Sequence, residues 1–390
     1  MTTNPEIRPE NLVTPRMLWS LMCPRRFEIE YCKDYRLKGY RPPPWPAGLR
    51  GVLHTALRER DVVPIVDQVL KRPTDPLRVE VAVESVFRVY ADKIRKLRGN
   101  MRGDDLERSE KELCAAVEEA RRVLAHYDTV HPGYFEFAKS DGYPVVDKFV
   151  RAQLGESQWK YADRIDGVVM REALPPAVLV RHFTTSNEVT EVERLLGLKL
   201  ELIGKMWSAT QLMGRPVTTA LIDVIRSKAP SVPDPVKCMK CKGTKYENKK
   251  GEKDTFCSKC GGSGMGGMSQ KACDTTLDIW LATARQLGFG LEAESKRCAK
   301  TIRKLQERGE SFAYRTVVEV PVAALGRWEQ DTIATANLIG HYRKEGFWPR
   351  NPDVCVHRSG YCRYRKVCSH HGDEDVAWFT RVVEALPGLD

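Results

Sequence analysis

Residues 158–170 read QWKYADRIDGVVM, and residues 177–186 read AVLVRHFTTS. The first stretch alternates between polar and apolar side chains and the second is rich in β-branched residues, as is typical of β-strands. The linking residues 171–176, REALPP, are predicted to turn, so the two stretches form a β-hairpin. A helix over 190–213 and another strand in PVTTALIDVIRS (216–227) are predicted to follow.

Helical segments surround this predicted hairpin. Thr14 followed by Pro15 predicts the start of a helix, and the prolines of RPPPWPAG (41–48) end it. Further helices, which helical periodicity indicates, and a short strand in YRTVVEVPV (314–322) complete the order of elements. The predicted helices lie in 14–60 on either side of the proline break, and in 76–126, 276–310 and 326–345. This order predicts an α/β or α+β core wrapped in helical material.

Composition narrows the class of protein. Charged residues make up 29% of the 390 residues, which fits a soluble globular protein, and no run approaches the ~20 apolar residues of a membrane span. The first residues, MTTNPEIRPE, lack the pattern of a secretory signal, so we expect a cytoplasmic protein. A net charge of +11 favours a polyanionic partner such as nucleic acid.

Twelve cysteines in a reducing compartment point to metal binding more than to disulfides. Two CxxC pairs, Cys238 with Cys241 and Cys257 with Cys260, are separated by fifteen residues, which is a strong zinc-ribbon pattern. Many lysines surround these pairs, so the insert either grips a phosphate backbone or is a solvated loop that the metal stabilises. Four cysteines stand alone and are expected to be small buried hydrophobes: Cys32, Cys114, Cys273 and Cys298.

An ordered series of motifs resembles RecB-like nucleases of the PD-(D/E)XK superfamily, and most closely the phage-type members. The series is VTPRMLWSLMCPRRFEIEY (13–31), GVLHTALRER (51–60), ADRIDGVV (162–169), VLVRHFTTS (178–186) and NPDVCVHRSGYCRYRKVC (351–368). The resemblance implies a nuclease core in which two carboxylates on neighbouring strands hold Mg²⁺ and a nearby lysine assists the attacking water. Asp166 matches the first strand carboxylate, and His54 matches the histidine on the preceding helix.

The next strand departs from the family pattern of a carboxylate, any residue and a lysine. Arg181 and Phe183 occupy those two positions, and neither side chain replaces the lost function. The following helix offers Glu201 and Lys205 at the nearest matching spacing. These two are candidate substitutes for the lost groups, although a surface ion pair between them is the simpler expectation. The cleavage chemistry is therefore expected to be weakened or lost.

The resemblance also implies an iron–sulfur staple. Related nucleases hold a [4Fe–4S] cluster with one N-terminal and three C-terminal cysteines, and the matching residues are Cys23, Cys355, Cys362 and Cys368. The spacing of Cys355 and Cys362 is wider than in the related helicase-nucleases. A local zinc site that combines tail cysteines with His357, His370 or His371 is the alternative.

These motifs predict a PD-(D/E)XK restriction-endonuclease-like α/β (α+β) core with a helical arm and a zinc-ribbon insert. We expect a DNA-binding protein of recombination, repair or DNA-end processing, with a helicase or recombination protein as candidate partner and no membrane contact. An active Mg²⁺-dependent exonuclease or endonuclease using Asp166 and a non-standard second ligand is one alternative. A metal-stapled interaction protein that does not bind DNA is another.

The expected regions are N-terminal helices (1–60), helical arm (61–133), core strands and helix (134–231), zinc-ribbon insert (232–273), and C-terminal helices with staple cysteines (274–390).

Overall fold

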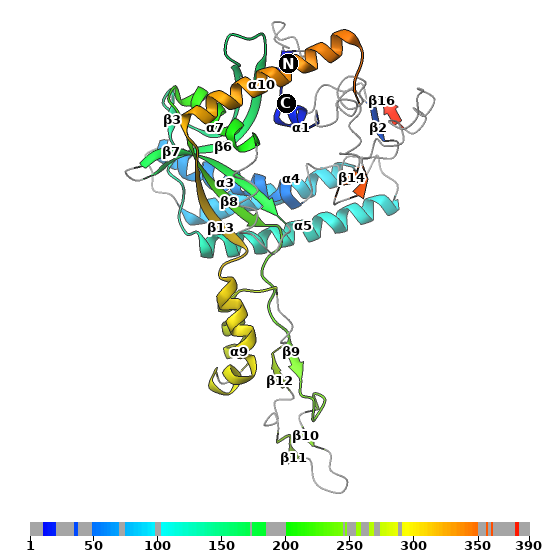
Figure 1. Ribbon diagram of the computed structural model, residues 1–390. Helices are drawn as coiled ribbons and strands as arrows, with labels where there is room; N and C mark the ends of the chain where they lie inside the picture. Colours follow the sequence, from blue (N-terminus) through cyan, green and yellow to red (C-terminus); the bar gives the residue numbers. More distant parts are fainter. Residues whose placement is uncertain are drawn as a thin grey trace.

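A mixed β-sheet lies between two groups of helices, and a slender arm extends away from them (Figure 1). The computed structural model describes residues 11–20, 35–37, 49–69, 75–97, 103–171, 174–184, 200–244, 246–247, 255–258, 265–268, 274–287, 291–349, 356–357, 360–361 and 379–381. The mixed sheet with helices on both faces confirms the expected α/β (α+β) class.

Six strands form the main sheet. The strands are β1 (Leu12–Val13), β5 (Val146–Gln153), β6 (Lys160–Arg171), β7 (Leu174–Thr184), β8 (Thr219–Arg226) and β13 (Ala313–Glu319). Their order is β1-β6-β7-β8-β13, and β5 also pairs with β6. The predicted hairpin is confirmed, because β6 and β7 are antiparallel neighbours. Strand β8 runs parallel to β7, and β13 is antiparallel to β8.

Helices α7 (Leu200–Met213) and α10 (Val322–Glu345) cover one face of the sheet. Val178 and Val180 of β7 belong to the core on this side. Three buried aromatic rings hold the layer together: Tyr161 on β6 lies edge-on to Trp328 at 4.8 Å between centroids, and Trp207 lies 5.5 Å from Trp328. Such edge-on and tilted contacts are favourable because the rings carry opposite charge at edge and face.

The opposite face is covered by α3 (Leu49–Val69) and α5 (Gly103–Val130), with α4 (Pro76–Leu97) packed against both. Apolar residues of α3 at helical spacing, such as Leu53 and Leu57, meet Phe87, Tyr127 and Phe183 in one buried cluster. Helix α3 runs through the boundary that the sequence suggested at residue 60. Because α5 reaches the sheet, the helices expected as a separate arm form a layer of the fold.

The remaining elements lie at the periphery. The segment predicted as one helix over 276–310 contains two described helices, α8 (Leu277–Gln286) and α9 (Leu291–Arg308). The arm contains β9 (Pro235–Lys237) paired with β12 (Met265–Met268), and β10 (Tyr246–Glu247) paired with β11 (Thr255–Phe256). The other short elements are α1 (Pro15–Ser20), β2 (Tyr35–Leu37), β3 (Lys139–Ser140), β4 (Tyr143–Pro144), β14 (Val356–His357), β15 (Gly360–Tyr361) and β16 (Phe379–Arg381). In the described part of the chain, no helix combines the length and apolar character needed to cross a bilayer.

Packing between α7 and the sheet predicts an effect of Gly204→Ala. A Cβ at Gly204 would lie 2.6 Å from the Tyr161 hydroxyl and 2.8 Å from Trp328 Cζ2, and both side chains are buried. We expect the substitution to lower the free energy of unfolding by about 1–3 kcal/mol, because the aromatic layer must shift. At Gly326, within α10, a Cβ would meet no atom within 4 Å. Gly326→Ala should therefore stabilise by up to ~1 kcal/mol through helix propensity. Urea unfolding of both variants measures the contrast, and equal effects would contradict it.

Candidate functional site

Charged side chains of alternating sign cross the sheet on four adjacent strands: Asp166 on β6, Arg181 on β7, Asp223 on β8 and Arg315 on β13. Arg181 and Asp223 are direct partners in the parallel β7–β8 pair, and Asp223 and Arg315 are partners in the β8–β13 pair. We call these four residues the charge row. Charged side chains are depleted in buried strands, so each member needs a partner of opposite charge.

Helices α3 and α5 supply partners from above the sheet. His54 Nε2 on α3 lies 2.8 Å from Asp166 Oδ1, and Asp61, two turns further along the same face of α3, forms an ion pair with Arg181. From α5, the Tyr127 hydroxyl donates a hydrogen bond of 2.5 Å to Asp223 Oδ2. Arg315 closes the network by donating to Asp223 Oδ1 at 2.7 Å and to the Tyr127 oxygen at 2.5 Å.

The position of Asp166 is set by the end of the β6–β7 ladder. Backbone pairing between β6 and β7 ends at Gly167 and Leu179. Just beyond this end of the ladder, the Arg181 backbone N–H donates to Asp166 Oδ2 at 2.9 Å. Both carboxylate oxygens of Asp166 therefore accept a hydrogen bond from the protein. The His54 side chain remains 34% exposed, so this end of the charge row reaches the surface.

The local charges control protonation at the centre of the charge row. Burial opposes ionisation of Asp166, but the hydrogen bond from His54 and the positive charges of Arg181 and Lys205 outweigh it and lower the pKa of Asp166. Burial also opposes the charge on Arg181, yet the carboxylates of Asp61 and Asp166 raise the pKa of Arg181 above its usual value. Burial raises the pKa of Asp61, because the attraction of Arg181 only partly offsets the loss of water.

The structure brings together most of the site residues that the sequence suggested. His54 and Asp166 are hydrogen-bonded, Arg181 contacts Asp166, and the ring of Phe183 lies edge-on to His54 at 6.5 Å between centroids. Lys205 reaches the same end of β6 from α7, where its ammonium donates to the Arg164 carbonyl at 2.7 Å.

The expected surface ion pair between Glu201 and Lys205 is not formed, although both residues are described. Glu201 is exposed on the first turn of α7, whereas Lys205 lies 3.4 Å from the buried carboxylate of Asp163. Burial deprives Asp163 of water, and the backbone carbonyl next to it lies where the β6–β7 ladder has ended. A buried carboxylate together with a backbone carbonyl attracts an ammonium more strongly than an exposed glutamate does.

Four functional partners were missed by sequence reasoning: Asp61, Tyr127, Asp223 and Arg315. Asp223 carried the same signal as Asp166, a carboxylate inside an apolar strand, in ALIDVIR (220–226). Asp61 and Tyr127 carried no such signal, because charged and aromatic residues are common in helices.

The residues at this site do not fit a Mg²⁺ ion. Mg²⁺ takes near-octahedral oxygen ligands, and the family arrangement needs a second carboxylate on the neighbouring strand. That position holds Arg181, whose side chain is 2% exposed, pairs with Asp61 and is attracted by the charge of Asp166. Repulsion between a guanidinium and a cation is about 4 kcal/mol per unit of cation charge at ~4 Å and an effective dielectric near 20. We therefore derive no metal-dependent step here.

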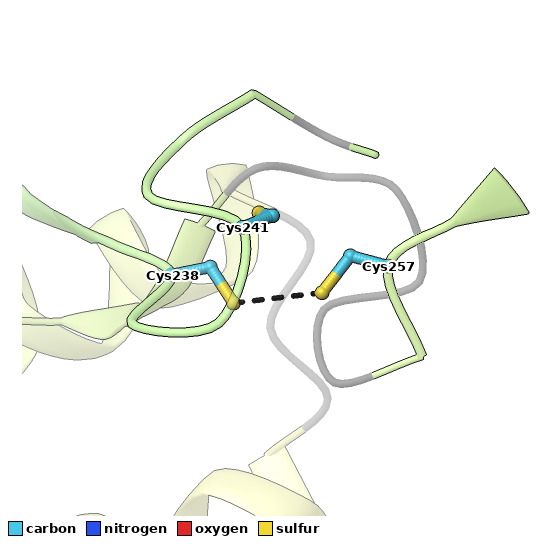
Figure 2. Close-up of side chains that lie close together, drawn as sticks. All are labelled: Cys238, Cys241 and Cys257. Atoms are coloured by element: carbon cyan, nitrogen blue, oxygen red, sulfur yellow. Dashed lines mark hydrogen bonds between the residues drawn. The ribbon is translucent and has the colours of Figure 1, made fainter. Parts of the chain in front are cut away.

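A second cluster lies in the arm, where three buried cysteines face one another. The sulfur atoms of Cys238, Cys241 and Cys257 all lie within 4.8 Å, and Cys238 Sγ is 3.8 Å from Cys257 Sγ (Figure 2). A hydrogen bond from the Cys241 backbone N–H lowers the pKa of Cys238, favouring the thiolate that binds metals. Gly243 follows in the left-handed region with φ of +91°, and it turns the chain around the sulfurs. This cluster could hold a metal ion.

The remaining expected cysteine ligands fall outside the described residues. These are Cys260 of the ribbon and the four proposed staple cysteines, Cys23, Cys355, Cys362 and Cys368. Among the isolated cysteines, Cys114 was expected to be buried but is exposed on α5. It lies on the solvent side of an amphipathic helix, so its thiol packs against no core.

Comparison with known proteins adds no assignment. The chain matches no model of a known protein family, and no curated protein matches it either.

The buried pair of Arg181 and Asp61 predicts a large stability effect. Arg181→Met should lower the free energy of unfolding by about 3–5 kcal/mol, because the buried Asp61 then keeps only the longer contact of 3.8 Å to Arg60. Asp61→Leu in the same chain should recover much of this loss, which a double-mutant cycle by urea unfolding measures. Arg108→Met, which removes an exposed ion pair on α5, is the control and should cost less than ~1 kcal/mol. Additive effects at residues 61 and 181 would contradict the pairing.

The lowered pKa of Asp166 predicts a specific pH dependence. A carboxylate whose pKa is lower in the folded than in the unfolded chain stabilises the fold above the unfolded pKa, near ~4, and this stabilisation is lost as pH falls through the folded pKa. The difference in unfolding free energy between wild type and Asp166→Asn should thus be largest at neutral pH and shrink below pH ~4. Urea unfolding across pH 3–7 tests this, and a pH-independent difference would contradict it.

Proposed function

We propose that this chain is a DNA-binding member of the PD-(D/E)XK nuclease superfamily in which cleavage is weak or lost. The observation that carries the proposal is the buried guanidinium of Arg181, which pairs with Asp61 at the position where the family places a metal-binding carboxylate. Its positive charge also attracts Asp166, whose carboxylate accepts a hydrogen bond from the Arg181 backbone N–H.

The order of elements supports the family proposal. The resemblance implies a helix with a histidine, a strand with the first carboxylate, a neighbouring strand with the second position, and then a helix. Helix α3, strands β6 and β7, and helix α7 follow that order, and His54 meets Asp166 across 112 residues of sequence. This long-range contact is the one that the family arrangement would bring about, and it therefore supports the proposal.

The basic charge of the chain supports DNA as the partner. A protein that contacts phosphates with lysine and arginine releases counterions, so its affinity falls steeply with salt. Recombination, repair or end processing is the proposed setting, in the cytoplasm and with a helicase or recombination protein as partner. Binding in these processes can be useful without cleavage, because a protein that holds an end also positions other enzymes there.

Zinc is the proposed ion of the cysteine cluster, with Cys260 as the fourth ligand. Three convergent thiolates suit a structural zinc site, which four cysteines would close to substrate. A [4Fe–4S] cluster bound by Cys23, Cys355, Cys362 and Cys368 remains a separate proposal, which rests on the resemblance alone.

Metal analysis distinguishes these sites. Anaerobically purified protein should contain zinc, and Cys238→Ser should remove it because one thiolate ligand is lost. Iron and a brown colour should persist in Cys238→Ser and disappear in Cys23→Ala. Zinc that survives Cys238→Ser would contradict the ribbon site, and colourless protein without iron would contradict the staple.

The absence of strong cleavage is the central prediction. Linear single- and double-stranded DNA should be bound with a salt-dependent affinity but cut slowly or not at all with Mg²⁺ or Mn²⁺, because Arg181 fills the cation position. Binding by fluorescence anisotropy and cleavage by gel assay are measured on one preparation, with Asp166→Ala as control. Robust cleavage that disappears in Asp166→Ala would show that a second carboxylate has replaced the lost one.

A further inference from the structure

We propose that the tip of the arm binds single-stranded DNA by stacking bases on Tyr246 and Phe256. This inference rests on the proposed DNA-binding function and names the form of DNA that is recognised. Figure 1 shows β10 and β11 at the far end of the arm from the main sheet, where an extended strand can reach them.

The two aromatic rings form one exposed surface. Tyr246 on β10 and Phe256 on β11 are direct partners in the antiparallel pair, and their rings stack at 5.4 Å between centroids with 21° between planes. Phe256 is 66% exposed and Tyr246 39% exposed, so the stacked pair is open to solvent. Two adjacent exposed rings form a contiguous apolar patch, and patches of this kind are common at ligand-binding surfaces.

Charge complementarity identifies the ligand as a polyanion. Exposed lysines flank the cysteine cluster next to the rings: Lys237, Lys240 and Lys242. Residues 235–262 contain eight lysines and three acidic residues, a net charge of +5 out of +11 for the whole chain. Lysines that grip a phosphate backbone, interleaved with aromatic rings on which bases stack, are how proteins bind single strands without reading sequence.

The cysteine cluster holds the rings in place. Phe256 directly precedes Cys257, and the Thr244 hydroxyl lies 2.7 Å from the Cys241 carbonyl and 3.0 Å from the Tyr246 carbonyl. Lys240 from the first cysteine loop contacts Ser258 in the second, with 2.6 Å between Nζ and Oγ. An ion bound by the cysteines would fix both loops, and with them the spacing of rings and lysines.

Stacking requires bases that are not already paired. In a duplex each base is stacked within the helix, and its face is closed to a protein ring unless the base is unpaired first. The rings therefore favour single strands, unwound ends and gaps over intact duplex, whereas the lysines contact the phosphates of either form.

An abasic oligonucleotide separates stacking from charge. A labelled 20-nucleotide strand, the same strand without bases, and the matching duplex are titrated with the full-length protein by fluorescence anisotropy. We expect the base-containing strand to bind on the order of tenfold more tightly than the abasic strand, since stacking contributes ~1–3 kcal/mol per base. The variant Tyr246→Leu/Phe256→Leu keeps an apolar pair but no ring, and it should bind both strands equally.

Three controls make the outcome decisive. Tyr143→Leu removes a ring that is 72% exposed on β4 and should leave affinity unchanged. Tyr246→Trp/Phe256→Trp should restore the preference for bases, and zinc content measured on each variant shows whether the ribbon is intact. Lys237→Gln/Lys240→Gln/Lys242→Gln should reduce the slope of log affinity against log salt by about 2 on both strands.

Each contrary result overturns a different claim. Equal wild-type affinity for base-containing and abasic strands, or tighter binding of duplex, overturns the stacking proposal and leaves DNA binding in place. Unchanged base preference in the leucine variant overturns the role of Tyr246 and Phe256. Preferential competition by an RNA strand of the same sequence overturns DNA as the ligand. No binding to any DNA overturns the proposed function itself.

Discussion

The guanidinium of Arg181 is the charge around which the sheet and its helical cover are arranged. A buried cation has no water to solvate it, so it requires a fixed acceptor, and Asp61 of α3 supplies one. The backbone N–H of the same residue donates to Asp166, which ties the end of β6 to β7. Asp223 extends the alternation to β8, where Tyr127 of α5 and Arg315 of β13 complete it. Displacing any one element would leave a charge unpaired at the centre of the molecule.

Buried ion pairs contribute little net stability compared with apolar residues of the same volume, but they penalise wrong arrangements heavily. The charge row thus specifies register: a shift of β7 against β8 by one residue would turn Arg181 to the opposite face, into the apolar core beneath α7. A site built for catalysis faces a conflict here, because carboxylates that converge on an open metal position repel one another until the metal arrives. Arg181 removes that conflict permanently. The same substitution that stabilises the empty arrangement also opposes a metal ion, and this links the fold's stability to the proposed loss of cleavage.

The local parts of the fold could be predicted from the sequence, and the long-range pairings could not. The β6–β7 hairpin followed from alternation around Asp166, and the helical region 76–126 followed from its periodicity. Strand β5 was missed, because VDKFVRAQ (146–153) mixes charged and apolar residues without a clear period of two. The meeting of His54 with Asp166 was suggested only by the family resemblance. Asp61 and Arg315 could not be assigned to Arg181 and Asp223, because a single sequence does not show which distant charges meet. Lys205 likewise contacts Asp163 and not Glu201 because Asp163 is buried, and the spacing of residues along a helix does not reveal burial.

The charge row and the arm use charge in opposite ways. In the row, guanidinium and carboxylate groups neutralise one another and are withdrawn from water, so they offer little field to a distant polyanion. In the arm, lysines stand exposed around a cluster of sulfurs, and a short segment carries almost half of the net charge of the chain. Charge that is to attract DNA must remain solvated, and Lys237, Lys240 and Lys242 are exposed in the arm. The cost of an extended arm is that few apolar residues remain to hold it together, and a metal ion bound by the cysteines would replace the missing core.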